Sequence, residues 1–183
     1  DRAAVRTGAS VKEIGTVLKE LGSAGLTTEE SIAALDSTLN NIIGTDSSVV
    51  ETTRLVASTY NILKDSITGT NDQLSNFNRI NDIFVRATNE SSLEMDQLVQ
   101  SLKFSITASK ESGLNLEELT GILGQLADQG LRGGNAGRAL RSALQQISKD
   151  APLVAKALNI DIDLDKPLDL LSIIKQYSEQ IKG

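Results

Sequence analysis

The sequence contains neither cysteine nor histidine among its 183 residues. The absence of cysteine excludes disulfides and thiolate metal sites. The absence of histidine removes the commonest general base and metal ligand at neutral pH. Catalysis would therefore have to rest on paired carboxylates in a cleft. We do not expect the chain to be an enzyme, or to bind a cofactor or a metal.

Aromatic residues and prolines are scarce as well. Phe, Trp and Tyr together make up 3% of the chain, and Trp is absent. A core of Leu, Ile, Val and Ala with few aromatics favours the packing of helix against helix. Both prolines, Pro152 and Pro167, lie beyond Asp150, so long unbroken helices are permitted before that residue.

Positive charge is in the minority, since 18 basic residues face 24 acidic ones and the net charge is −6. An acidic chain binds phosphate backbones and anionic lipid poorly, so we expect no sequence-specific nucleic acid partner. No apolar run approaches the roughly 18 residues of a membrane-spanning helix. The chain starts at Asp1 without an initiator Met or a signal-peptide core, and we expect it to be a fragment of a longer polypeptide.

Signals for the starts of helices are abundant. In a capping box, a polar residue and an acidic residue three positions later bond to each other's backbone. Such boxes begin at Ser10, Thr27, Ser48, Ser91 and Asn115. Apolar residues at helical spacing follow each box, and further stripes start near Leu74, Ala136 and Leu168. We predict an all-α fold, a multi-helix bundle or array of about seven to eight helices with short glycine-containing turns.

Glycine and proline predict where helices end. We expect the first helix to end by Gly22 or Gly25, the second at Gly44, and the fifth at Gly113. Pro152 is expected to open a short helical turn of its own. Residues 159–166 then read as a loop, and a last helix starts at Pro167.

The chain is expected to form a single helical domain, within which one motif occurs twice. The pattern from Gly25 to Glu30 returns from Gly113 to Glu118, at an offset of 88 positions. It indicates either a duplicated helix–turn–helix unit or two ordinary caps of the same kind. The candidate sub-units are residues 10–64 and 72–148, followed by a C-terminal loop and helix over residues 149–183.

Acidic residues cluster in three places, and in each of them we expect a structural role and not a catalytic or metal-binding one. Glu29 and Glu30, like the pair Glu117 and Glu118, fall in the first turn of a helix, where carboxylates complete caps and face the positive end of the helix dipole. The alternating run Asp161, Asp163 and Asp165 lacks the glycine and the distal glutamate of a calcium loop. We interpret it as a solvated acidic turn.

The segment from residue 130 to residue 141 combines four glycines with three arginines: Gly130, Gly133, Gly134, Gly137, Arg132, Arg138 and Arg141. No Gly-Lys-Ser/Thr motif follows and no apolar strand precedes, so the segment is not a nucleotide-binding loop. The favoured interpretation is a tight turn between two closely packed helices. The alternative is that the arginines contact an anion or an acidic partner at the start of the helix.

The order of these motifs resembles the core region of tail tape measure proteins of long-tailed bacteriophages. The likeness rests on the two Gly-Leu-x-x-Glu-Glu helix starts at Gly25 and Gly113, and on a closing signature in Leu126-Ala127, residues 130–133 and residues 136–141. It covers about residues 21–177. The chain departs from the family in carrying asparagines where relatives have Ala and Gly, namely Asn61, Asn76, Asn78 and Asn81.

The resemblance implies a structural protein of the virion tail, found in the host cytoplasm during assembly. It implies a role in tail assembly, in the determination of tail length and in genome ejection, with chain length converted to distance at about 1.5 Å per helical residue. The implied partners are tail-tube subunits, tail-tip or baseplate proteins, tail assembly chaperones and further copies of the chain as a trimer or hexamer. A stand-alone helical adaptor that binds other proteins is the alternative function.

Overall fold

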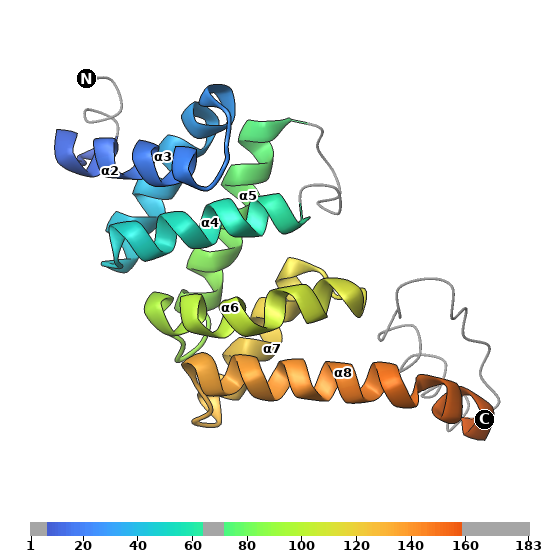
Figure 1. The fold of residues 1–183 in the computed structure, drawn as a ribbon. Coiled ribbons are helices and arrows are strands. Elements are labelled where there is room, and N and C mark those ends of the chain that lie inside the picture. The colour runs from blue at the N-terminus through green and yellow to red at the C-terminus, as the bar shows by residue number, and fades with distance from the viewer. Residues whose placement is uncertain (1–6, 64–71, 159–183) are drawn as a thin grey trace.

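The computed structural model describes residues 7–63 and 72–158, and within these ranges it contains seven α-helices and no strand. The helices carry the labels of Figure 1 and are α2 (Val11–Ser23), α3 (Thr28–Thr45), α4 (Val49–Leu63), α5 (Gln73–Asn89), α6 (Met95–Glu111), α7 (Leu116–Asp128) and α8 (Gly133–Leu158). The prediction of an all-α, multi-helix fold is confirmed.

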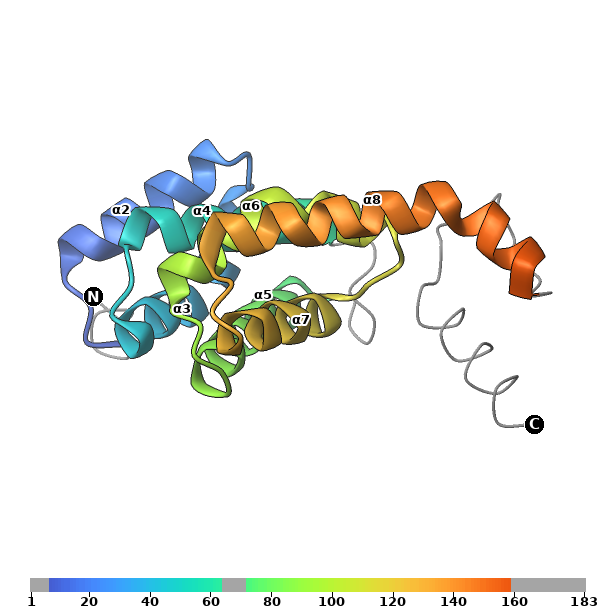
Figure 2. The same cartoon turned by 90° about the horizontal axis from the view of Figure 1, so that it is seen from below.

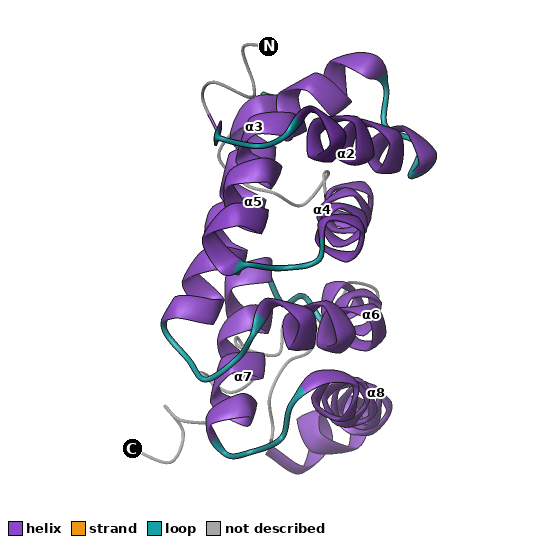
Figure 3. Ribbon diagram, turned by 90° about the vertical axis from the view of Figure 1, so that its left-hand side faces the viewer, coloured by secondary structure: helices purple, strands orange, loops and turns teal. Residues whose placement is uncertain are grey.

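The helices lie in two layers. In Figure 3, α2, α4, α6 and α8 follow one another in one layer, and α3, α5 and α7 follow one another in the other. Each helix contacts the helices one and two positions away along the chain, so that α4 touches α2 and α6, and α5 touches α3 and α7. The arrangement is therefore an open array in which neighbours stack, like helical repeat proteins, and not a closed bundle.

The core runs between the two layers and is mostly aliphatic. Its largest fully buried side chains include Leu21, Leu39, Leu98, Leu102 and Leu123. Aromatic rings enter it from α4 and α5, where Tyr60 stacks on Phe77 with ring centroids 4.2 Å apart and Phe84 is fully buried. Burial of these side chains supplies the main force that holds the array together.

Three of the turns share one construction. Gly25, Gly113 and Gly130 have positive φ angles of 88°, 73° and 89°, which glycine adopts without the steric cost that a side chain brings. The leucine after each glycine donates its N–H to a carbonyl five residues back, as in Leu114 to Ser109 at 3.0 Å. This is the Schellman ending of a helix, and it confirms the predicted ends at Gly25 and Gly113.

Three of the predicted capping boxes are complete. The N–H of Ser10, Thr27 and Asn115 donates to the glutamate three residues later at 2.7, 2.8 and 2.9 Å respectively, and that glutamate's N–H donates back to the cap side chain. At Ser48 only half of the box forms. Glu51 N–H lies 3.4 Å from Ser48 Oγ, while the Glu51 carboxylate accepts from Lys103 at 2.7 Å.

The box predicted at Ser91 is wrong. Helix α6 starts at Met95 with Glu94 as its N-cap, and Gln97 accepts the Glu94 N–H at 3.4 Å. The Ser91 hydroxyl donates instead to the Ala87 carbonyl at 2.7 Å, one turn back at the end of α5. A serine that can bond a preceding carbonyl competes with its own use as a cap.

Two predicted boundaries are also wrong, because packing overrides the local signal. Helix α3 continues through Gly44 and ends where Asp46 takes the left-handed conformation, with φ of 48°. Helix α8 continues through Pro152 to Leu158, and its Leu144 is buried in the core of the array. The predicted loop over residues 159–166 and the helix from Pro167 lie outside the described residues.

Some apolar residues that share the predicted helical spacing do not enter the core. Ile32 on α3 is 64% exposed, and Leu74 and Ile147 are also exposed. Ile32 on α3 and Ile147 on α8 belong to the end helices of their layers, where a side chain can keep helical spacing without having a neighbour to pack against, and Leu74 lies in the first turn of α5.

Polar side chains are buried between α3 and α5. Asn41 and Asn81 are 1% and 3% exposed, and Asn41 donates from its amide to Asn81 Oδ1 at 2.9 Å. The Asn81 amide donates to the Phe77 carbonyl at 2.9 Å and to Ser37 Oγ at 3.2 Å. These directional contacts fix how far α3 can slide along α5, because a shift breaks bonds that no water replaces.

Candidate functional site

The segment singled out in the sequence joins α7 to α8 and forms the first turns of α8. Gly130 N–H donates to the Ala127 carbonyl at 2.9 Å and closes α7. Gly133 also has a positive φ, of 58°, and is the first residue of α8. Gly133 and Gly134 therefore belong to the start of the helix, and the turn itself consists of residues 129–132.

Gly137 lies against the backbone of α6. A Cβ atom at this position would come within 2.2 Å of the Ser101 carbonyl oxygen, which is far inside van der Waals contact. One turn earlier, the Gly133 carbonyl accepts the Ser101 hydroxyl at 2.8 Å. The start of α8 therefore approaches α6 as closely as two helix backbones can.

Helix α6 offers a matching surface of small side chains. Ser101, Ser105 and Ser109 recur every fourth residue, and all three are buried. The hydroxyls of Ser105 and Ser109 donate to the carbonyls four residues earlier in α6, as in Ser105 to Ser101 at 3.0 Å, and so need no partner outside the helix. Sequence reasoning missed this surface, although small residues at every fourth position were the available signal.

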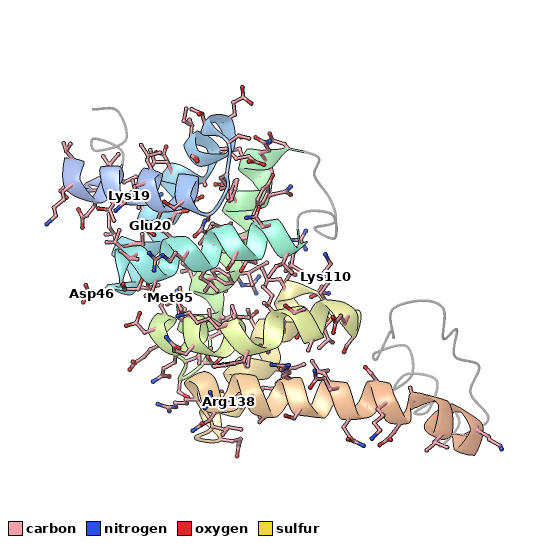
Figure 4. The ribbon with its side chains drawn as sticks, in the orientation of Figure 1. Lys19, Glu20, Asp46, Met95, Lys110 and Arg138 are labelled. Atoms are coloured by element: carbon pink, nitrogen blue, oxygen red, sulfur yellow. The ribbon has the colours of Figure 1, made fainter. Side chains whose placement is uncertain are left out.

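Gly134 is less constrained than Gly137. A Cβ there would lie 3.1 Å from Arg138 Nη1 and 3.1 Å from Phe104 Cε2, and both are atoms of side chains. The Arg138 guanidinium lies over the Phe104 ring at 4.7 Å from its centroid and donates to Asn135 Oδ1 at 2.8 Å. Figure 4 shows Arg138 at the first turns of α8.

The three arginines of this segment differ in the contacts that their side chains make. Arg132 Nε donates to the Ala127 carbonyl at 3.1 Å and so helps to cap the end of α7. Arg138 is held by Phe104 and Asn135, and Arg141 is exposed on α8. Contact of these arginines with an anion or an acidic partner stays a prediction.

The paired glutamates take part in structural contacts. Glu30 and Glu118 each accept the N–H of the residue that caps their helix, at 2.8 and 2.9 Å. Glu117 pairs with Arg79, whose Nε lies 2.9 Å from Glu117 Oε1, and this ion pair joins α7 to α5. Three of the four paired glutamates, Glu30, Glu117 and Glu118, are thus engaged in holding helices.

A cleft of about 360 Å³ lies between α5 and α7. Small and apolar residues line it, among them Ile83, Ala87 and Gly121, and its charged lining residues have structural partners. Asp128 accepts both the N–H and the hydroxyl of Ser92 at 2.7 Å, and Arg86 pairs with Glu90 at 3.3 Å. The cleft therefore brings together no unengaged acid and base.

Three carboxyl groups have a lowered pKa. The Ser10 hydroxyl and N–H lower the pKa of Glu13, the Lys103 ammonium lowers that of Glu51, and the Ser92 N–H and hydroxyl lower that of Asp128. These groups stay ionised at neutral pH, whereas a general acid needs a raised pKa. Among residues 7–63 and 72–158 there is also no group of three or more side chains able to hold a metal ion.

None of the helices in the described ranges combines the length and the apolar character needed to cross a membrane. The most hydrophobic surfaces of the helices are those that face one another inside the array.

Comparison with known proteins identifies the family. The family described as phage-related minor tail protein matches the chain over residues 1–183. The tape measure protein of Pneumococcus phage Dp-1 is 26% identical over 153 residues, which is 84% of this chain and 13% of that protein. The chain thus spans about an eighth of the length of this relative. No solved structure matches the chain.

The match over the whole chain agrees with the resemblance found in the motifs and with an array whose polar side chains serve caps and helix contacts. The chain belongs to the family of phage-related minor tail proteins.

Proposed function

We propose that the chain is a folded helical segment of a tape measure protein, and that this longer protein acts in tail assembly, in the determination of tail length and in genome ejection. The observation that carries the proposal is the similarity of 84% of the chain to the tape measure protein of phage Dp-1. The proposed location is the virion tail, reached from the host cytoplasm during assembly.

The segment acts through the surfaces of its helices and carries out no covalent chemistry. Its paired glutamates cap helices or join them, and the glycines of residues 130–137 set the approach of α8 to α6. The proposed partners are tail-tube subunits, tail-tip or baseplate proteins and tail assembly chaperones.

A folded array spans much less distance than the same chain would span as one extended helix. A single extended helix of 183 residues would be roughly 270 Å long, at about 1.5 Å per residue. Here turns separate the seven described helices, which pack on one another in two layers and do not form one continuous rod (Figure 2). We therefore assign this segment a role as an assembly module, and the measuring role to other parts of a longer parent chain.

Deletion in the parent phage tests this assignment. Removal of the segment should reduce the yield of complete tails without shortening those that form. The matched control is a deletion of equal length in a part of the parent chain with an uninterrupted helical pattern, which should shorten tails. Electron microscopy measures both quantities. Tails shortened by roughly 270 Å on deletion of this segment would show that it works as an extended ruler.

Self-association as a trimer or hexamer is proposed because tail tubes have threefold or sixfold symmetry. Exposed apolar side chains are available for it on α3 and α5, namely Ile32, Ile43 and Leu74. Light scattering on the purified chain measures the mass. A trimer or hexamer supports the proposal, whereas a stable helical monomer favours the stand-alone adaptor.

A further inference from the structure

Helix α8 is the last described helix of its layer and is unusually basic. Residues 131–158 contain five basic residues and one acidic residue, Asp150, in a chain whose net charge is −6. Among the described helices, α8 packs mainly on α6 and also on α7. Figures 1 and 3 show α8 at one end of the array, with α6 on one side only.

The basic residues share one side of α8. Ala136, Leu140 and Leu144 are buried in the core and mark the side of α8 that packs on the array. At 3.6 residues per turn, Lys149 and Lys156 lie within about 20° of each other on the opposite side. Arg138 starts from the same row, but its guanidinium leans over Phe104 at the edge next to α6, and Arg141 lies within about 60° of Arg138. All four are exposed. We call Arg138, Arg141, Lys149 and Lys156 the basic face.

Neutral residues flank the basic face along its length. Ala139, Ser142 and Gln146 are exposed beside it, and Leu153 is 69% exposed. Ala139 and Ser142 are small, and small residues let another helix approach closely, as Gly137 and Ser101 do between α8 and α6. The basic face and its neutral flank therefore form a surface on which another helix could pack, and Leu153 supplies a large exposed apolar side chain there.

The charges exclude a second copy stacked end to end. The outer side of α2, at the opposite end of the layer, carries exposed Lys12 and Lys19 beside Gly15 (Figure 4 labels Lys19). Stacking α8 of one copy on α2 of the next would bring lysines against the basic face, and pairing two copies of α8 would do the same. Like charges placed opposite each other across an interface oppose association.

We propose that the basic face of α8 binds an acidic amphipathic helix from outside residues 1–183. This helix extends the layer of α2, α4, α6 and α8 by one position, with its carboxylates on the basic face and its small or apolar side chains against Ser142 and Leu153. The proposal does not depend on the proposed function, because it follows from the charge and the packing of α8 alone.

Binding of a designed peptide tests the proposal on the complete chain. The probe is a fluorescent helical peptide as long as α8, with Glu on one face and Ala and Leu beside it, and its control has Gln in place of every Glu. Anisotropy should show saturable binding of the Glu peptide, weakened by salt, and little binding of the Gln peptide. The substitution Lys149→Gln/Lys156→Gln should weaken binding by at least about tenfold.

The matched control is Lys12→Gln/Lys19→Gln, which makes the same change of charge on α2 and should leave binding unchanged. Introduction of a bulky side chain by Ser142→Trp should also weaken binding, because it fills the space beside the basic face. Circular dichroism verifies that each variant stays helical. Equal losses in the α2 and α8 variants would show attraction by net charge alone and overturn the proposal.

Three further results would overturn it. Double-stranded DNA could bind the basic face more tightly than the Glu peptide. The chain could self-associate through Lys149 and Lys156, as sedimentation would show. Finally, Asp161→Asn/Asp163→Asn/Asp165→Asn could strengthen peptide binding, which would mean that the chain's own carboxylates occupy the basic face.

Discussion

Two helix pairs in this molecule solve the same packing problem in different ways. Between α3 and α5, buried amides and hydroxyls bond to one another, with Asn41 and Asn81 at the centre. Between α6 and α8, the side chains are so small that backbone meets backbone, with Gly137 against Ser101. The α3–α5 contact depends on the direction of its hydrogen bonds, and the α6–α8 contact depends on how closely the two backbones approach.

The difference shows how an array with few aromatics can define its own geometry. Aliphatic side chains alone permit several ways of stacking two helices, because hydrophobic burial is not directional. The amide network of α3 and α5 selects one alignment along the helix axes. The missing Cβ of Gly137 selects one point of closest approach, since a longer side chain anywhere nearby would hold the helices apart.

The largest expected effect comes from breaking the close approach. The substitution Gly137→Ala should destabilise the fold by about 3 kcal/mol, because its Cβ would lie 2.2 Å from the Ser101 carbonyl oxygen and the helices must separate. Gly121→Ala is the control, since no atom lies within 4 Å of its Cβ, and it should stabilise by about 0.5 to 1 kcal/mol. Chemical denaturation measures both, and a stabilised Gly137→Ala would contradict the close contact.

Breaking the polar pair should have the next largest effect. Asn81→Leu removes the acceptor of the buried Asn41 amide and should cost about 2 kcal/mol of stability. In the double variant Asn41→Leu/Asn81→Leu the unpaired amide is gone, so the loss should be smaller than in Asn81→Leu alone. A double variant that loses the sum of the two single losses would show that the two amides do not act as a pair.

Helix caps sharpen the comparison because α3, in one of the two pairs, and α7, next to the other, begin with the same capping box. Thr27→Ala at the start of α3 and Asn115→Ala at the start of α7 should each cost about 1 kcal/mol, since each residue accepts the N–H of a glutamate three positions later. Thermal denaturation should give similar losses. Clearly unequal losses would mean that the two turns, which share a sequence pattern, differ in energy for reasons beyond the caps.

The smallest expected effect is a dependence on pH. The α3–α5 network has no titrating group, whereas Asp128 accepts the Ser92 N–H between α7 and the start of α6. The lowered pKa of Asp128 means that the unfolded chain binds its proton more readily. This contribution is complete above the ordinary pKa of about 3.9 and disappears as the pH falls through the lowered value.

Asp128→Asn removes that titration. Its stability difference from the natural sequence should therefore shrink as the pH is lowered from neutral into the acid range. Denaturation curves at a series of pH values measure this difference. A difference that stays constant with pH would mean that the bonds to Ser92 do not favour the ionised form.

Local features of the fold could be predicted from the sequence, because capping and turn chemistry act within a few residues. The boxes at Ser10, Thr27 and Asn115 are examples. The box at Ser91 does not form because its hydroxyl bonds back to the end of α5, and Pro152 does not open a turn of its own because α8 continues through it. A local sequence pattern records neither contact. The burial of Asn81 and the contact of Gly137 with Ser101 join residues 36 or more positions apart, and the sequence alone does not show which helices meet.

The candidate site was foreseen in its glycines and only partly in its arginines. The four glycines of residues 130–137 indicated a close contact between helices, and the structure places Gly137 against α6. The attachment of Arg138 to Phe104 could not be foreseen, because it requires the stacking of α8 on α6. Lys149 and Lys156 became notable only once α8 was seen to run through Pro152 as one helix.

The open array also determines how the chain responds to a pulling force. Each helix is held mainly by neighbours one or two positions along the chain, and no strand or disulfide ties distant parts together within the described ranges. Tension applied at the two ends of such a chain is released by peeling off one terminal helix at a time, each at a modest force. A closed bundle of the same size would resist until it gave way all at once. This segment can therefore be drawn out gradually and can re-form in the same stepwise manner when the tension ends.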